Sequence, residues 1–499
     1  MRHGSSSGPN TSPQIDFLSV LTLAILSCIL YSNTLQGEFL FDDLRLILHN
    51  QQIRIPDLSI GSLINAASTT RPVAMLSFAL NHYFHQYNVI SYHIVNIFIH
   101  FLSATFLYFF IKNTLRLPSI YEKYQDMRWL PSITAVLWLA NPIHTQSVSY
   151  IIQRMNSMSA MFYILAMLLY NKARTSLTLA GKSLLFISCT ISFLLAFGSK
   201  EIAVTLPFFI LLYEWYFFQN LNKKWLYTSL IISGLLCLLV GFLYWLTPTF
   251  FPTGILSSGY SIYDFTLPQR VLTEFRVVLL YISLIFFPHP SRLNLDYDFP
   301  LSYSLVDPPT TLIAIILCIA GVILAGLLSN REKLISFCLL WFSGNLLIES
   351  SVIPLDLVFE HRTYLPSMLL ILLTVILICK LIKFKSAHLI IFAVTIAVFS
   401  TWTYQRNNVW KNALSLLIDT AHKSPEKARP FYNVACEYAK KNDAKKAIIW
   451  LKESISKNDF DRWDLLKYDK DLDKIRNSAE FDMLITTDVP IKYRILFSE

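Results

Sequence analysis

The sequence predicts an all-α, polytopic membrane protein of about eleven transmembrane helices, followed by a short soluble helical domain. Of its 499 residues, 54% are hydrophobic and only 15% are charged, whereas soluble domains are about 25% charged. Apolar runs recur that are long enough to cross about 30 Å of hydrocarbon. The basic residues behind the net charge of +9 lie in short connections between these runs. That distribution indicates membrane orientation and argues against nucleic-acid binding.

The spans follow from the apolar runs in order. A polar N-terminus, residues 1–16, precedes the first run, which has no small-residue cleavage site, so we expect a retained helix. Alternate later connections are rich in Lys and Arg, which places them and the N-terminus in the cytoplasm. The expected spans are residues 17–35, 93–111, 129–141, 156–171, 183–197, 202–218, 226–246, 310–328, 334–348, 364–382 and 387–402.

Two segments need separate treatment. The run 129–141 is short for a span and must be extended, tilted or placed where the protein is thin. Residues 278–290 are apolar but end at two prolines, and a span there would move every later loop to the other side. We therefore expect a half-buried external helix at 278–290. All seven cysteines are isolated, which favours buried thiols over disulfides or metal ligands.

The other connections, all on the predicted external side, mix charged residues and histidines with aromatics and prolines. Polar groups at a membrane edge are costly and need a partner or a function. One such loop would be ordinary solvation, but six on one face favour a shared external site.

Several stretches resemble one enzyme family. They are FDD, RPVAMLSFALNHYF, SYHIVNIFIH, NPIHTQSVSYIIQR, GSKEIAVTLPFFILLYEW and FEHRTYLP, in this order and followed by a TPR-like tail. They resemble the bacterial relatives of the transmembrane, TPR-containing O-mannosyltransferases of the GT-C superfamily. The chain departs from the animal members at Gln146, where those have a glutamate, so any acid role of that position is in doubt.

The resemblance implies a GT-C fold over residues 17–404 and an inverting glycosyltransferase. Such an enzyme moves a sugar from a polyprenyl-phosphate donor to an acceptor outside the cytoplasm, and we expect the acceptor here to be a Ser or Thr hydroxyl of an exported protein. The implied location is the bacterial inner membrane, with the active site and C-terminus facing the periplasm. In GT-C enzymes an acidic residue of the first external loop is catalytic, and the matching positions here are Asp42 and Asp43.

Independently of the resemblance, the chemistry of Asp42 and Asp43 suits a general base. A base must take the proton of the incoming hydroxyl, and burial or a second carboxylate raises a carboxyl pKa toward a useful range. We predict Asp42 as the base, with Asp43 as substitute or orienting group. The alternative is that Asp42 caps the following helix LRLILHN.

The departing phosphate needs cations, and arginine and lysine bind phosphate well. Structural ion pairs between the neighbours Lys200 and Glu201, or Glu360 and Arg362, are alternatives, as is interfacial snorkelling of Arg71 and Arg154. The candidate donor-phosphate ligands are Arg71, His144, Arg154, Lys200, Arg292, His361 and Arg362.

A second set of candidates is acidic: Glu201, Asp296, Asp298 and Glu360. Asp296 and Asp298 alternate, so on an extended segment they face the same way. That spacing would suit a divalent metal, but no ligand motif accompanies it, and the identity of any metal stays open.

Residues 405–499 have a soluble composition. A TPR pattern of about 34 residues fits from Ala428, and we expect a helix over 410–423 to pack against it and the segment 461–485 to cap it. Because TPR units are stable only when stacked, this domain is either a stabilising cap or a binding site for the acceptor protein. Its apolar signature positions are Val434, Ala435, Tyr438, Ala447 and Leu451.

Two other functions fit the same outline. A transporter or flippase of lipid-linked glycan would need charges at the middle of its spans, whereas the charges here lie at external helix ends. A non-catalytic, membrane-anchored TPR scaffold is the third alternative.

Overall fold

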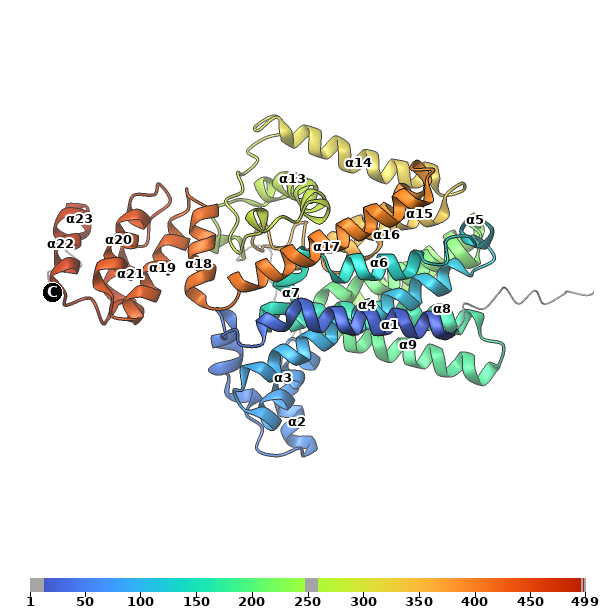
Figure 1. Ribbon diagram of the computed structural model, residues 1–499, viewed down its shortest axis with the longest axis horizontal. Coiled ribbons are helices and arrows are strands. Elements are labelled where there is room, and N and C mark those ends of the chain that lie inside the picture. The colour runs from blue at the N-terminus through green and yellow to red at the C-terminus, as the bar shows by residue number, and fades with distance from the viewer. Residues whose placement is uncertain (1–12, 247–258, 495–496, 498–499) are drawn as a thin grey trace, which may run out of the picture.

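The computed structural model describes residues 13–246, 259–494 and 497, and every regular element in these ranges is a helix (Figure 1). The predicted all-α, polytopic architecture is confirmed. Six stretches are long and apolar enough to cross a membrane: Pro13–Thr34, Val89–Leu115, Leu179–Phe197, Glu201–Phe218, Thr310–Leu328 and Lys385–Val409. Three shorter apolar helices also coincide with expected spans: Leu130–Leu139, Lys333–Leu346 and Ser367–Leu381.

A helix lies at each of the eleven predicted runs. The central helix α8 packs between α4 and α9. Most of its buried apolar residues belong to the main hydrophobic core. The predicted shortness of 129–141 is seen in α6, which has 10 residues. The helices are α1 (Pro13–Tyr31), α4 (Val89–Leu115), α6 (Leu130–Leu139), α8 (Arg154–Thr175), α9 (Leu179–Ser199), α10 (Leu206–Tyr213), α11 (Lys223–Leu246), α14 (Thr310–Leu328), α15 (Lys333–Leu346), α16 (Ser367–Leu381) and α17 (Lys385–Val409).

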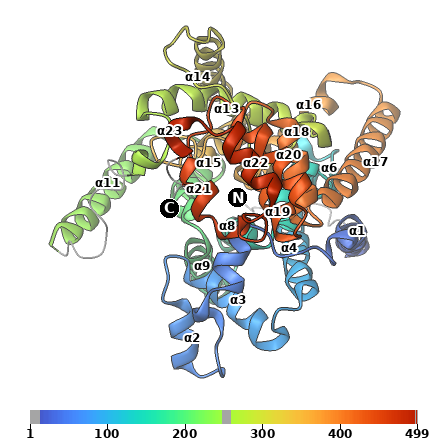
Figure 2. The ribbon, with the colours of Figure 1, turned by 90° about the vertical axis from the view of Figure 1, so that its left-hand side faces the viewer.

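Helix α13 (Leu267–Phe286) lies across one end of the bundle, whereas α14 is seen nearly end-on in the same view (Figure 2). The apolar stretch predicted at 278–290 is therefore the second half of a longer helix, which stops before Pro288. Thr266 and Gln269 form a capping box at its start. Shorter helices occupy the same end: α2 (Ile60–Ala67), α3 (Pro72–His85) and α7 (Thr145–Ser149).

The C-terminal helices stack in a row beyond this end of the bundle (Figure 1). They are α18 (Ala413–Lys423), α19 (Ala428–Lys440), α20 (Ala444–Ile455), α21 (Trp463–Tyr468), α22 (Ala479–Thr487) and α23 (Ile491–Arg494). We call them the tail. Because α17 continues to Val409, the expected domain boundary after residue 404 falls inside a helix.

Four of the five apolar positions predicted for the tail are buried, and the fifth, Tyr438, is half-buried. Val434 and Ala435 of α19 and Leu451 of α20 are fully buried. Helix α18 packs on α19, and the segment that follows α20 buries Leu466 and Leu484 in the same tail core. The expected order of a leading helix, a helical pair and a capping segment is thus present.

Candidate functional site

The two aspartates of the first loop lie in different environments. Asp43 is fully buried, with 0% of its surface exposed, whereas Asp42 is exposed. The N–H of Leu40 donates to Asp43 Oδ2 at 2.8 Å, and the N–H of Ile152 donates to Asp43 Oδ1 at 2.7 Å. Burial raises the pKa of Asp43 to about 8, although both of these donors act to lower it. Asp43 is therefore a tether between two loops, and Asp42 is the carboxylate open to its surroundings.

The loop that carries this pair contains a strained residue. Phe41 has a φ of 46°, in the left-handed region that non-glycine residues seldom adopt. The N–H of Asp42 donates to Tyr150 Oη at 3.0 Å. This hydrogen bond connects the turn to a segment that is distant in the sequence. The alternative that Asp42 caps the next helix is wrong, because Asp43 occupies the N-cap of the π-helix Leu44–Leu48 and makes no side-chain bond to it.

Four predicted phosphate ligands come together: Arg71, Lys200, His361 and Arg362. Burial, followed by the charges of Lys200, Arg362 and Arg71, lowers the pKa of the His361 imidazole well below its usual value. Arg71 precedes α3, Lys200 follows α9, and the other two residues lie in the 3-10 helix Glu360–Thr363. Segments far apart in the sequence thus build one cationic cluster.

The ion pairs of this cluster differ from the expected neighbouring pairs. Arg71 Nε lies 3.0 Å from Glu201 Oε1, and Lys200 Nζ lies 2.7 Å from Glu349 Oε1. Adjacent side chains on an extended segment point to opposite sides, which separates Lys200 from Glu201. Burial alone would raise the pKa of Glu349, but the charges of Lys200 and Arg362 outweigh burial and keep that pKa below its usual value.

Arg362 is not paired with Glu360. Its guanidinium donates to the carbonyl oxygens of Leu357 at 3.0 Å and Asp356 at 2.6 Å, and its Nε, buried, has no partner among the described residues. The Glu360 carboxylate instead accepts from Tyr297 Oη at 2.8 Å. Because hydrogen bonds to neutral carbonyls leave the charge of Arg362 in place, this residue adds positive potential to the cluster.

The short segment 150–156 links the aspartate pair to the cation cluster. Near its start the N–H of Ile152 holds Asp43, and at its end Asn156 Oδ1 accepts from Lys200 Nζ at 2.9 Å. Ile152 belongs to a short 3-10 helix, Ile151–Gln153, and Asn156 to the first turn of α8. One short segment therefore makes hydrogen bonds both to the aspartate loop and to the cation cluster.

Gln146 occupies a structural position in this site. Its Oε1 accepts from the N–H of His361 at 2.8 Å and lies 3.2 Å from the ring Nδ1 of the same residue. Asn156 Nδ2 donates to the carbonyl oxygen of His361 at 2.7 Å. The backbone of His361 is thus fixed on both sides by amide side chains.

Two of the predicted phosphate ligands lie in the core instead. Arg154 is fully buried; its guanidinium donates to Asn96 Oδ1 at 2.7 Å and Asn81 Oδ1 at 2.8 Å, and it sits 4.5 Å from the ring centre of Phe78. It is neither a snorkelling residue nor open to a ligand.

His144 is likewise a core residue. Its ring lies 4.7 Å from that of Trp138 and 5.0 Å from that of Tyr364, and neither ring nitrogen has a partner among the described residues. An imidazole enclosed by aromatic rings and fully buried does not reach a donor phosphate.

Arg292 does not join the cluster either. Its guanidinium donates to the carbonyl oxygen of Phe287 at 2.9 Å and to Ser283 Oγ at 2.8 Å. These bonds satisfy the free end of α13, where a cation is favourable. Arg292 is a helix cap.

Asp296 and Asp298 do not form a joint acidic site. Asp296 is bridged by Lys427 and Arg429 of the tail, each at 2.8 Å. Asp298 is exposed, and its N–H donates to Ser424 Oγ at 3.2 Å. The chain bends at Leu295 and Asp296, and the Asp296 carboxylate holds the tail against the membrane domain.

Sequence reasoning missed three charged residues next to the cluster: Glu349, Arg270 and Glu274. Arg270 Nη2 lies 2.9 Å from Glu274 Oε1 and donates to the carbonyl oxygen of Glu349 at 2.9 Å. The only signals were the i, i+4 spacing of the α13 pair and the position of Glu349 at a helix end. Neither signal reveals burial, which is what makes these charges important.

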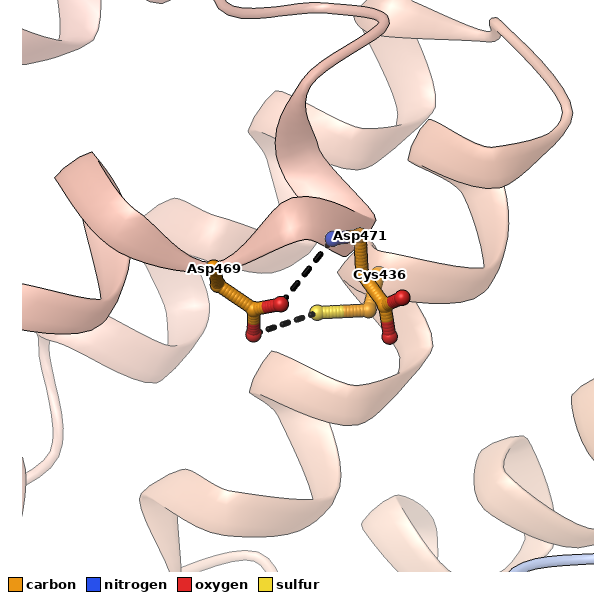
Figure 3. A group of neighbouring side chains, drawn as sticks. All are labelled: Cys436, Asp469 and Asp471. Atoms are coloured by element: carbon orange, nitrogen blue, oxygen red, sulfur yellow. Dashed lines mark hydrogen bonds between the residues drawn. The ribbon is translucent and has the colours of Figure 1, made fainter. Parts of the chain in front are cut away.

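In the described part of the chain one group has metal-ligand geometry, and it lies in the tail (Figure 3). The ligand atoms of Cys436, Asp469 and Asp471 are all within 4.8 Å of one another. However, Asp471 forms an ion pair with Lys440 at 2.9 Å, and Asp469 Oδ2 accepts from Tyr432 Oη at 3.1 Å. Because other partners already use these carboxylates, the group does not fit a divalent cation.

Curated relatives of the chain are described as protein O-mannosyl-transferases. A protein O-mannosyl-transferase of Caenorhabditis elegans is 25% identical over 451 residues, which cover 83% of this chain and 59% of that protein. Protein O-mannosyl-transferase Tmtc3 of Drosophila melanogaster is 23% identical over 538 residues, which cover 91% of this chain and 56% of that protein. The chain is homologous to the TMTC protein O-mannosyl-transferases.

Protein O-mannosyl-transferase TMTC1 of Homo sapiens is 32% identical over 163 residues, or 30% of this chain and 18% of that protein. The chain spans somewhat more than half the length of the worm and fly O-mannosyl-transferases. No family model matches the chain, and no solved structure matches it.

Proposed function

We propose that this chain is an inverting membrane glycosyltransferase that moves a sugar from a polyprenyl-phosphate donor to a Ser or Thr hydroxyl of an exported polypeptide. The observation that carries the proposal is the exposed carboxylate of Asp42, tethered through Asp43 and residues 150–156 to a cluster of cations. The names of the relatives support the reaction class.

Asp42 is the proposed general base. The acceptor oxygen attacks the anomeric carbon while the bond from that carbon to the donor phosphate oxygen breaks, and the hydroxyl proton passes to the Asp42 carboxylate. A positioned base of this kind contributes about 10²–10⁴ in rate. Asp43 is a positioning residue, because both of its carboxylate oxygens are engaged by backbone N–H groups.

Arg71, Lys200 and Arg362 are the proposed ligands of the donor phosphate. Arg71 is the most accessible, since its side chain is 35% exposed and its partner Glu201 is 53% exposed. A pair this exposed contributes little stability, so the guanidinium is free to exchange a carboxylate for a phosphate. Lys200 and Arg362 are more buried and supply fixed positive potential as charge develops on the leaving phosphate.

The site and the tail are proposed to lie outside the cytoplasm, facing the periplasm of a bacterial inner membrane. The basic connections between the spans support this orientation. A reporter fused after Glu499 is expected to be active only if it is exported. A cytoplasmic signal from that fusion would contradict the orientation.

The activity is tested in membranes that contain the full chain, with labelled polyprenyl-phosphate mannose as donor and a Ser/Thr-containing peptide as acceptor. Transfer of label to peptide is expected with the wild-type chain and not with Asp42→Asn. Asp298→Asn, which removes an exposed charge from another external loop, is the matched control. Equal transfer by Asp42→Asn and the control would refute the role of Asp42.

A further inference from the structure

A cleft lies between the membrane domain and the tail. It has a volume of about 620 Å³, which is in the range of ligand sites. One wall comes from membrane-domain residues 263–265, 295–297, 299, 301 and 356–359, and the opposite wall from tail residues between Lys427 and Asp469. The double ion pair of Asp296 with the tail closes one side.

The cleft is acidic, although the chain as a whole is basic. Six aspartates and three cations line it, and two of those cations, Lys427 and Arg429, are already paired with Asp296. The carboxylates of Asp264, Asp356 and Asp461 have no hydrogen bond or ion pair with another described residue. These three line the cleft from both walls, and none of them is buried.

Aromatic side chains supply the apolar part of the lining. Tyr263 and Phe265 stack at 4.9 Å on the membrane-domain wall, and Phe460 faces the cleft from the tail. Phe359 lines the cleft and also stacks on His361 at 5.2 Å. One end of the cleft is therefore a single side chain away from the cation cluster of the proposed active site.

We propose that this cleft binds the acceptor polypeptide as an extended segment that carries Lys or Arg side chains near the glycosylated Ser or Thr. The inference rests on the proposed function. Free carboxylates on both walls complement basic side chains, and they repel the anionic donor, whose phosphate belongs to the cationic cluster. A neutral glycan is the competing occupant, and it would bind without regard to the charge of the aspartates.

The test is direct binding to the full chain in detergent. The probe is a short fluorescent peptide in which lysine alternates with threonine, and a second peptide has glutamate in place of lysine. The variant pair Asp264→Asn/Asp461→Asn removes one charge from each wall. The pair Asp298→Asn/Asp482→Asn removes one exposed charge from the membrane domain and one from the tail, both outside the cleft lining.

We expect the lysine peptide to bind and the glutamate peptide not to bind. The cleft variant should weaken binding of the lysine peptide roughly fivefold to tenfold, because each lost surface contact contributes up to about 1 kcal/mol. In the transfer assay it should raise KM for the peptide and leave kcat unchanged. The control variant should match the wild type in both assays.

Equal binding of the lysine peptide by the two double variants would overturn the proposal, as would binding of a neutral oligomannose in preference to it. The readouts also separate this proposal from the proposed reaction. Charge-dependent binding without any transfer would contradict the transferase while the cleft assignment stands. Transfer with unaltered KM in the cleft variant would contradict the cleft assignment alone.

Discussion

Substituting each aspartate of the first loop by asparagine should separate positioning from chemistry. Asp43 accepts two backbone N–H groups, from Leu40 and Ile152, in a fully buried position. Even a protonated carboxyl accepts through both oxygens, but an amide NH₂ cannot accept. Asp43→Asn therefore leaves one buried N–H facing an N–H, at a cost of about 1–3 kcal/mol for each group left unsatisfied.

Asp42→Asn changes an exposed side chain. Exposed substitutions usually alter stability by less than about 0.5 kcal/mol, so this variant should unfold like the wild type. Its kcat should nevertheless fall about 10²–10⁴-fold, because the proposed base is lost. Asp43→Asn, unlike Asp42→Asn, should lower the stability of the protein, and its apparent Tm should be several degrees below that of the wild type.

Both variants are measured in the same detergent by thermal unfolding and by transfer of labelled sugar to peptide, normalised to folded protein. The reasoning is refuted if Asp42→Asn keeps wild-type kcat. It is also refuted if Asp43→Asn retains the wild-type Tm yet abolishes transfer, since that result would make Asp43 the base and the tether dispensable.

The remaining predictions concern the charges around the site. Lys200→Met should lower stability by about 3–5 kcal/mol because Glu349 is left as a buried unpaired charge, and Lys200→Met/Glu349→Leu should recover part of that loss in thermal unfolding. Arg71→Ala should raise KM for the donor with little change in Tm, whereas Arg292→Ala should lower Tm and leave donor KM unchanged. For Asp43 the folded-state pKa of about 8 exceeds the usual 3.8, so the folded state binds more protons and its stability should fall as pH rises between these values. Asp43→Asn should flatten the pH dependence of Tm in that window.

Hydropathy located the long apolar helices of this fold. A helix lies at each of the eleven predicted apolar runs, because a span must satisfy its own backbone in lipid and has few alternatives. The helices α2 and α3 and the first half of α13 were not predicted, since they are too short or too polar to give such a run. Spacing of small and apolar residues also located the α19–α20 pair of the tail, where Ala435 and Ala447 are fully buried. Local pattern determines local structure in both cases.

The ion-pair and hydrogen-bond partners of the charged residues could not be predicted from hydropathy or spacing. Lys200 finds Glu349, which is 149 positions away, and not its neighbour Glu201. Nor does sequence separate Arg71, which is partly exposed, from Arg154, which is buried and saturated by asparagines. An arginine at a helix end looks the same in both settings, because burial depends on how distant helices pack.

The two adjacent aspartates have different roles: Asp42 is the exposed, proposed base, and Asp43 is the buried residue that holds its loop in place. The left-handed conformation of Phe41 is unfavourable for a bulky residue, so the turn that exposes Asp42 needs other contacts to stabilise it. Asp43 provides them, because its carboxylate accepts hydrogen bonds from the N–H of Leu40, before the turn, and from the N–H of Ile152, in another segment. A single aspartate at position 42 would be equally exposed but would lack the anchor to the segment that carries Asn156 and, through it, Lys200. The pair therefore sets where the proposed base stands relative to the cations, which is the geometry that transfer from a lipid phosphate requires.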